Sequence, residues 1–121
     1  MNDLNEVLDL DLNKISIYGI NEEKLVALKN CDYNLKSNFY FWLINKIHIL
    51  EAKNLSKELA YANYLMSYYI FIVFTPLSYE ELAFYHIEKA LKYDDNIDYK
   101  EWILIFATLP NPFLKTYAAI K

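Results

Sequence analysis

Residues 59–79 read LAYANYLMSYYIFIVFTPLSY, a run of 21 residues without a charged side chain. A run of this length suits either a helix that crosses a membrane or a helix that is buried on all sides in a helical domain. The residues that interrupt the run with polar or helix-breaking character are Asn63, Ser67, Thr75, Pro76 and Ser78. Its five tyrosines are spread along its length, whereas a membrane-spanning helix keeps such residues at its two ends. We therefore expect a buried central helix over residues 55–74 and no membrane span.

The two sides of this helix differ in chemistry. One face is aliphatic and consists of Leu59, Ala62, Met66, Ile70 and Val73. Beside it Tyr61, Tyr64 and Tyr68 form a stripe at positions i, i+3 and i+7. A buried tyrosine hydroxyl needs a hydrogen-bond partner. We expect either water at the rim of the core or groups on a binding partner to satisfy these hydroxyls.

Helical periodicity and capping residues predict the elements around the central helix. One glycine and three prolines in 121 residues argue against an all-β fold and against a disordered chain. Asn21, the capping box Ser78–Glu81 and Asp98 each mark a helix start. The predicted helices are 4–12, 22–30, 38–53, 55–74, 79–93, 99–108 and 113–120, with connections at 17–20 and 31–37. This pattern predicts an all-α fold, a compact bundle of six to seven helices with helix-hairpin packing around helix 55–74, and one domain over residues 1–121.

Helix 38–53 presents apolar residues on two sides. The face that we expect to enter the core consists of Phe39, Leu43, Ile47 and Leu50. The opposite side carries Phe41, Trp42 and Ile49. A second apolar face indicates a second contact, so these three residues are candidates for an interface through which the protein self-associates weakly.

The chain is acidic and contains no arginine. Sixteen acidic residues against twelve lysines give a formal net charge of −4. Arginine is the usual two-point contact to phosphate and guanine, so its absence, together with the negative charge, argues against nucleic-acid binding. Cys31 is the single cysteine, which excludes an internal disulfide, and the acidic N-terminus has no signal-peptide pattern. We expect a cytoplasmic protein that suits a basic partner.

Signatures of catalysis and cofactor binding are missing from the sequence. His86 falls on the apolar face of helix 79–93, which predicts a core or rim histidine with a hydrogen-bond partner, and His48 flanks the exposed side of its helix. Two histidines and one cysteine give no metal-ligand spacing. The turn 94–98 resembles the start of a calcium loop, but Tyr99 stands where that loop requires glycine. We therefore expect no catalytic residue, no cofactor and no metal site.

Acidic residues gather in two parts of the chain. The first 13 residues hold four acids and no base, and a second group lies on the exposed face of helix 79–93 and in the turn that follows. An ordinary solvated surface is the alternative for any single one of them. An aromatic anchor among acids is typical of a docking surface for a basic protein. The residues predicted to bind the partner are Asp3, Glu6, Asp9, Asp11, Glu81, Tyr85, Glu88, Asp94, Asp95 and Asp98.

Two resemblances bear on function. Residues 78–96 resemble the second helix of a tetratricopeptide repeat, with Ala83, Ile87 and Ala90 at its core positions, which implies helix-hairpin packing. In its size, its acidity and its lack of catalytic groups, the chain resembles the small acidic immunity proteins that bacteria pair with toxins. This second resemblance implies a tight complex with a cognate toxin domain, and nuclease toxins are usually basic.

Our leading hypothesis is a non-catalytic protein that neutralises a cognate toxin domain by occluding it. The first alternative is a helical adaptor or regulatory module of tetratricopeptide type that self-associates. The second is a phage-encoded inhibitor whose carboxylates mimic nucleic acid. An enzyme is the hypothesis that the sequence supports least.

Overall fold

The computed structural model of the protein describes residues 2–110, with side chains from Leu4 onward, so the predicted helix 113–120 lies outside the described residues. Within them the chain forms helices and no strand, which confirms the all-α fold class. The elements are α1 (Asn2–Leu8), the 3₁₀ turn η1 (Ile17–Gly19), α2 (Glu22–Val26), α3 (Tyr33–Ala52), α4 (Ser56–Tyr68), the π-helical segment η2 (Tyr69–Phe74), α5 (Tyr79–Tyr93), α6 (Ile97–Leu104) and the 3₁₀ turn η3 (Ile105–Thr108).

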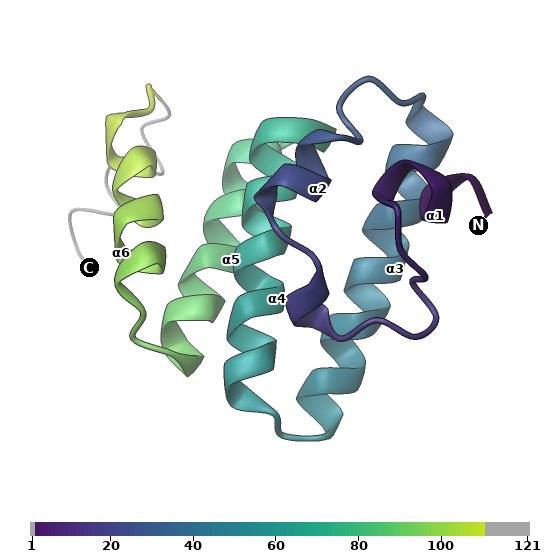
Figure 1. The fold of residues 1–121 in the computed structure, drawn as a ribbon. Coiled ribbons are helices and arrows are strands. Elements are labelled where there is room, and N and C mark those ends of the chain that lie inside the picture. The colour runs from purple at the N-terminus through teal and green to yellow at the C-terminus, as the bar shows by residue number, and fades with distance from the viewer. Residues whose placement is uncertain (1, 111–121) are drawn as a thin grey trace.

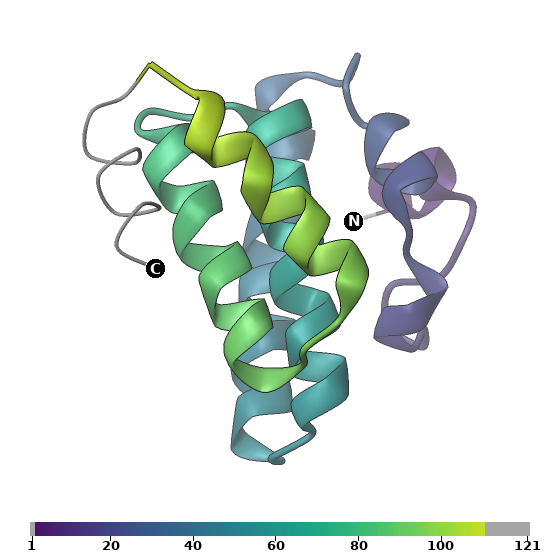
Figure 2. The ribbon, with the colours of Figure 1, turned by 90° about the vertical axis from the view of Figure 1, so that its left-hand side faces the viewer.

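Helices α3, α4 and α5 run in alternating directions through the centre of the bundle (Figure 1). Helix α4 contacts α3 on one side and α5 on the other. Helix α6 packs against α5 (Figure 2), and the segment that carries α1, η1 and α2 packs against α3, α4 and η2. Buried side chains from all of these elements form one core. This arrangement places α1 and α6 at opposite edges of the molecule (Figure 1).

Helix α4 is the buried centre that the uncharged run predicts. From Leu59 to Ser67, every residue except Tyr61 is buried. The aliphatic face continues into η2, where Ile70 and Val73 are buried as well. In the part of the chain that the structure describes, no helix has the length and apolar character that a membrane crossing requires. Burial on all sides accounts for the apolar composition of this run.

The central helix widens before it ends. In η2 (Tyr69–Phe74) the turns are π-helical, and at its end the Thr75 N–H donates to the Ile70 carbonyl, five residues back, at 2.9 Å. Thr75 adopts a left-handed conformation with φ of 41°, and Pro76 follows it. Since proline has no N–H to continue the helix, the end predicted at this position is confirmed.

The helix starts before the central helix agree with the sequence in one case and differ in the other. Asn21 caps α2, because its side-chain oxygen accepts a hydrogen bond from the Lys24 N–H at 3.0 Å. Helix α2 then ends at Val26, earlier than predicted. Asp32 accepts a hydrogen bond from the Leu35 N–H at 2.9 Å and starts α3 at the next residue. The predicted connection at 31–37 is therefore wrong, because its acidic residue is a helix cap.

The two predicted caps after the central helix are wrong, although the helices themselves form. Ser78 has a φ of 62° and makes no capping hydrogen bond with its side chain, so the predicted capping box is not formed. Helix α6 is capped by Asn96, whose side-chain oxygen accepts a hydrogen bond from the Asp98 N–H at 2.8 Å. The helix thus begins at Ile97, two residues before the predicted start. Because the Asn96 side chain already caps the helix, Asp98 lies inside the first turn of α6 instead of capping it.

Helix α3 places its apolar residues as predicted, with one exception. The buried face consists of Phe39, Leu43, Ile47 and Leu50. On the other side Phe41 is 65% exposed and Ile49 is 41% exposed. Trp42 differs from the prediction, because it is half-buried and its ring stacks on Phe39 with centroids 5.7 Å apart. An interface on this side of α3 would therefore use Phe41 and Ile49 rather than the Trp42 ring.

A polar pair is buried between α4 and α5. His86 Nδ1 lies 2.8 Å from Asn63 Oδ1, and the Asn63 amide donates to the Leu59 carbonyl at 3.0 Å. Since the Asn63 oxygen can only accept, the neutral imidazole carries its proton on Nδ1. The prediction of a core histidine with a hydrogen-bond partner is confirmed. Burial, and to a smaller extent the charge of Lys89, lowers the pKa of His86 to about 4.

This lowered pKa makes stability depend on pH. Below pH 6.5 the unfolded chain protonates His86, whereas the folded chain keeps it neutral until about pH 4. The free energy of unfolding should therefore fall as the pH falls from 6.5 to 4, by about 3 kcal/mol from this group. Urea unfolding at several pH values measures the loss, and His86→Gln should reduce it. His48→Gln removes an exposed histidine as the matched control, and an equal reduction in both variants would contradict the prediction.

Candidate functional site

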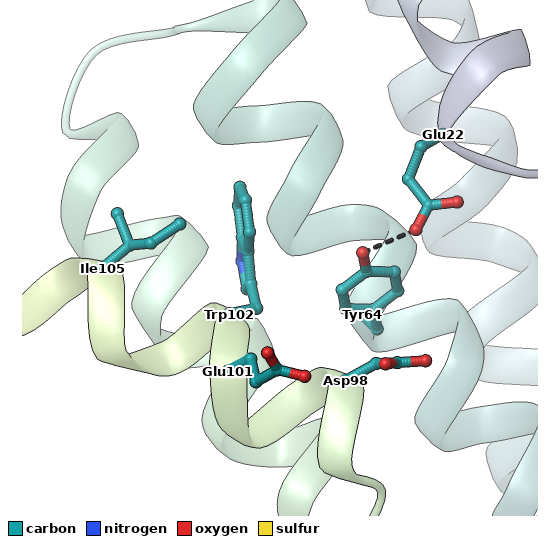
Figure 3. Close-up of a pocket in the computed structure, with 6 residues that line it drawn as sticks. All are labelled: Glu22, Tyr64, Asp98, Glu101, Trp102 and Ile105. Atoms are coloured by element: carbon teal, nitrogen blue, oxygen red, sulfur yellow. Dashed lines mark hydrogen bonds between the residues drawn. The ribbon is translucent and has the colours of Figure 1, made fainter.

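A groove opens between α2, α4 and α6, where three carboxylates surround two aromatic rings (Figure 3). It is open to solvent and has a volume of about 420 Å³. Helix α2 contributes one glutamate, α4 contributes one tyrosine, and α6 with the start of η3 contributes the other residues. The residues that line it are Glu22, Tyr64, Asp98, Glu101, Trp102 and Ile105. Tertiary folding thus builds one concave, acidic site from three separate parts of the chain.

The first aromatic wall, Tyr64, is held from two sides. Its ring stacks on Tyr99 with centroids 5.0 Å apart, and its hydroxyl donates to Glu22 Oε2 at 2.6 Å (Figure 3). Burial, followed by the hydrogen bond to Glu22, raises the pKa of Tyr64 far above its usual value. The hydroxyl therefore remains a donor at neutral pH and holds the Glu22 carboxylate at the edge of the groove.

The second aromatic wall, Trp102, is anchored through its indole nitrogen. Its Nε1–H donates to Ser67 Oγ at 2.8 Å, and the Ser67 hydroxyl donates in turn to the Ala83 carbonyl at 2.7 Å. The Trp102 and Tyr64 rings are 6.3 Å apart between centroids and meet at 81°. The chain of hydrogen bonds from α6 through α4 to α5 therefore fixes this ring nearly perpendicular to Tyr64.

The three carboxylates of the groove have no cationic partner within the described residues. Glu22 is half-buried, while Asp98 and Glu101 are exposed and lie three residues apart on α6. No described lysine forms an ion pair with any of the three, and Lys100 of α6 pairs with Asp95 at 2.9 Å instead. The groove thus combines three carboxylate side chains with fixed aromatic walls.

These carboxylates do not converge on a single point. Within residues 2–110, with side chains from Leu4, no group of three or more His, Cys, Asp or Glu residues is placed to hold a metal ion. Carboxylates that are spread around a groove suit a larger cation, one with several hydrogen-bond donors that point in different directions. The chemistry that the arrangement allows is recognition of such a cation.

The predicted acidic residues occupy separate parts of the surface. Asp98 lines the groove, and Asp95 close by is the exposed partner of Lys100. Asp94 is half-buried at the end of α5. The predicted N-terminal residues that are exposed, at the opposite edge of the bundle (Figure 1), are Glu6, Asp9 and Asp11, and the side chain of Asp3 lies outside the described residues. The structure therefore does not join the N-terminal acids to those of α6 in one patch.

The predicted face of α5 is less open than its spacing indicated. Glu81 and Glu88 are both half-buried. Tyr85 is 52% exposed, and Lys89 Nζ lies 5.4 Å from the centre of its ring. A cation of the same chain thus occupies one face of this aromatic residue, where a basic partner was expected to bind.

The sequence prediction missed most of the groove. Of its lining residues, the predicted partner-binding set includes only Asp98, and Tyr64 is predicted only as part of the tyrosine stripe. The hydroxyls of Tyr61 and Tyr64 find partners in their own chain, since Tyr61 donates to the Ile20 carbonyl at 2.5 Å and Tyr64 to Glu22. One sequence feature could have indicated the groove. Asp98 and Glu101 are three residues apart, which places two acids on the same side of a helix near its start.

Comparisons of the chain with models of protein families, with curated proteins and with solved structures gave no match. No family assignment follows from them. The groove and its chemistry are therefore interpreted from the residues that form it.

The anchor of the second wall can be tested with a matched pair of serines. Ser67→Ala removes the partner of the Trp102 indole N–H, so we expect a loss of about 1–3 kcal/mol in the free energy of unfolding. Ser37 of α3 is the control, because its Oγ is buried and has no hydrogen-bond partner within the described residues. Ser37→Ala should leave stability unchanged or raise it. Chemical denaturation measures both, and equal effects of the two substitutions would contradict this role of Ser67.

Proposed function

We propose that this chain is a non-catalytic binding protein that neutralises a cognate protein by covering it, as immunity proteins do with bacterial toxins. The observation that supports the proposal most directly is the groove between α2, α4 and α6 (Figure 3). Its carboxylates form no ion pair with a described lysine, and its aromatic walls are already fixed in place. Such a site suits a basic protein surface.

The distribution of charge supports the same partner chemistry. The net charge of −4 attracts a basic protein over distances of about 10 Å at moderate ionic strength. The acids of α1 and the following loop, at the far edge of the bundle, would add to this attraction without touching the partner. The distant charges would raise the association rate, and the contacts in the groove would provide specificity.

Co-purification tests this proposal. The tagged protein is expressed from its native locus, and proteins that elute with it in a one-to-one ratio are identified. The expected partner is basic, arrests growth when it is expressed alone, and loses this activity when the present chain is co-expressed. The absence of a stoichiometric protein partner, or a partner whose activity is unchanged in the complex, would contradict neutralisation.

Charge reversal in the groove should weaken this complex more than the same reversal elsewhere. Glu101→Lys places a positive charge where a basic group of the partner is expected, so we predict an affinity loss of about tenfold or more. Glu6→Lys makes the same change in net charge on α1, at the opposite edge, and should cost less than about threefold. Titration calorimetry with the purified partner measures both. Equal losses would place the interface outside the groove.

A second candidate function is self-association as a helical adaptor, which the exposed side of α3 favours. Phe41 and Ile49 lie on this side, and Tyr33 at the start of the helix is also exposed. Light scattering of the purified protein distinguishes the two functions. A strict monomer that binds no peptide would count against the adaptor.

A further inference from the structure

We propose that the groove between α2, α4 and α6 binds the guanidinium group of one arginine side chain presented by the partner protein. This inference rests on the proposed function in one respect, which is that the partner is a protein with exposed basic residues. It adds the identity of the group that enters the site. The residues that would contact it are Glu22, Tyr64, Asp98, Glu101 and Trp102.

The case for a cation rests on two independent features of the groove. The first is the set of three carboxylates without a cationic partner within the described residues, on two different helices. The second is the half-buried Trp102 ring, whose face attracts a cation through the ring quadrupole, while Tyr64 is only 8% exposed and forms the floor of the groove. Figure 3 shows the three acids placed around Tyr64 and Trp102, so a group bound beside Trp102 lies near carboxylates from both α2 and α6.

The geometry favours guanidinium over a compact cation. Guanidinium is planar and has five N–H donors at fixed angles, so it can lie flat against one ring while it donates to carboxylates at its edge. The half-buried Trp102 ring is the one that can provide this face contact, and Tyr64 meets it at 81°. An ammonium group has three donors at one point and no face to stack. The spread of the carboxylates therefore matches arginine better than lysine.

The walls of the groove are ordered before any ligand arrives. Tyr64 is held by Glu22 and Tyr99, and Trp102 is held by Ser67. Binding thus requires little ordering of side chains, which is one of the main costs of association. Glu22 can accept further hydrogen bonds, because a carboxylate offers about four acceptor positions and the tyrosine uses one.

No side chain of the protein itself can provide the proposed ligand. The chain has no arginine, so a guanidinium group must come from another molecule. The lysines that the structure shows in ion pairs, Lys89 and Lys100, pair with Glu51 and Asp95 outside the groove.

A peptide titration followed by NMR tests the inference without the partner protein. The probe is the capped peptide Gly-Gly-Arg-Gly-Gly, added to the full-length ¹⁵N-labelled chain. We expect the indole N–H signal of Trp102 to shift with a dissociation constant on the order of 1 mM, since one side chain makes the contacts. The signal of Trp42, on α3, is the internal control and should not move.

Two further peptides separate charge from shape. Replacing arginine by citrulline keeps the size and removes the charge, and this peptide should cause no shift. Replacing it by lysine keeps the charge, and the affinity should fall at least about threefold. Equal binding of the citrulline peptide would overturn a cation site, and equal binding of the lysine peptide would overturn the assignment to guanidinium.

Matched variants locate the site. Glu101→Gln should weaken binding of the arginine peptide about two- to fivefold, which is the range for one exposed ion pair. Glu6→Gln removes the same charge from α1 and should leave the affinity unchanged. An equal effect of both, or a shift of Trp42 instead of Trp102, would overturn the proposal.

The peptide titration does not use the partner protein, so its result is separate from the co-purification test. Binding of the arginine peptide, together with the absence of a co-purified toxin, would contradict the proposed function but would support this site.

Discussion

A helix that is buried on all sides imposes a strict condition on the rest of the protein, because each polar side chain on it must find a hydrogen-bond partner inside the fold. Helix α4 is such a helix between Leu59 and Ser67, and this part of it carries four polar side chains. Together they reach the N-terminal segment, α5 and α6. The pairs are Tyr61 with Ile20, Asn63 with His86, Tyr64 with Glu22, and Ser67 with both Ala83 and Trp102. Through these bonds α4 positions the N-terminal segment, α5 and α6 around itself.

The groove is a consequence of this condition. Two of the five partners, Glu22 and Trp102, belong to α2 and α6, which pack on the same side of α4 without closing over it. Tyr64 lies between them and is held by one of them. The same contacts that satisfy the buried helix therefore also fix the walls of the candidate site. A substitution that weakens the core at Ser67 should for this reason also loosen the binding surface, so stability and recognition are coupled in this fold.

Much of the fold could be predicted from residues that act locally or through periodicity. The apolar run gave the central helix, the spacing of Phe39, Leu43 and Ile47 gave the buried face of α3, and helix 79–93 has the predicted bounds. The predictions were wrong at two helix ends, since α1 and α2 end at Leu8 and Val26, each four residues earlier than predicted. They were also wrong at helix starts, where neighbouring acids and amides compete for the same N–H groups. Asp32 and Asn96 act as caps, whereas Ser78 does not, and the sequence alone ranks such competitors poorly.

The sequence by itself determined the helical class, the buried centre and the acidic, arginine-free character of the protein. These follow from hydrophobic spacing, from the scarcity of glycine and proline, and from composition, all of which can be read along one chain. Only the tertiary structure decided which acids share a site, because Glu22 and Glu101 are far apart in sequence and line one groove through the packing of α2 and α6 around Tyr64. The same packing places α1 and its acids at the edge of the molecule opposite α6 (Figure 1).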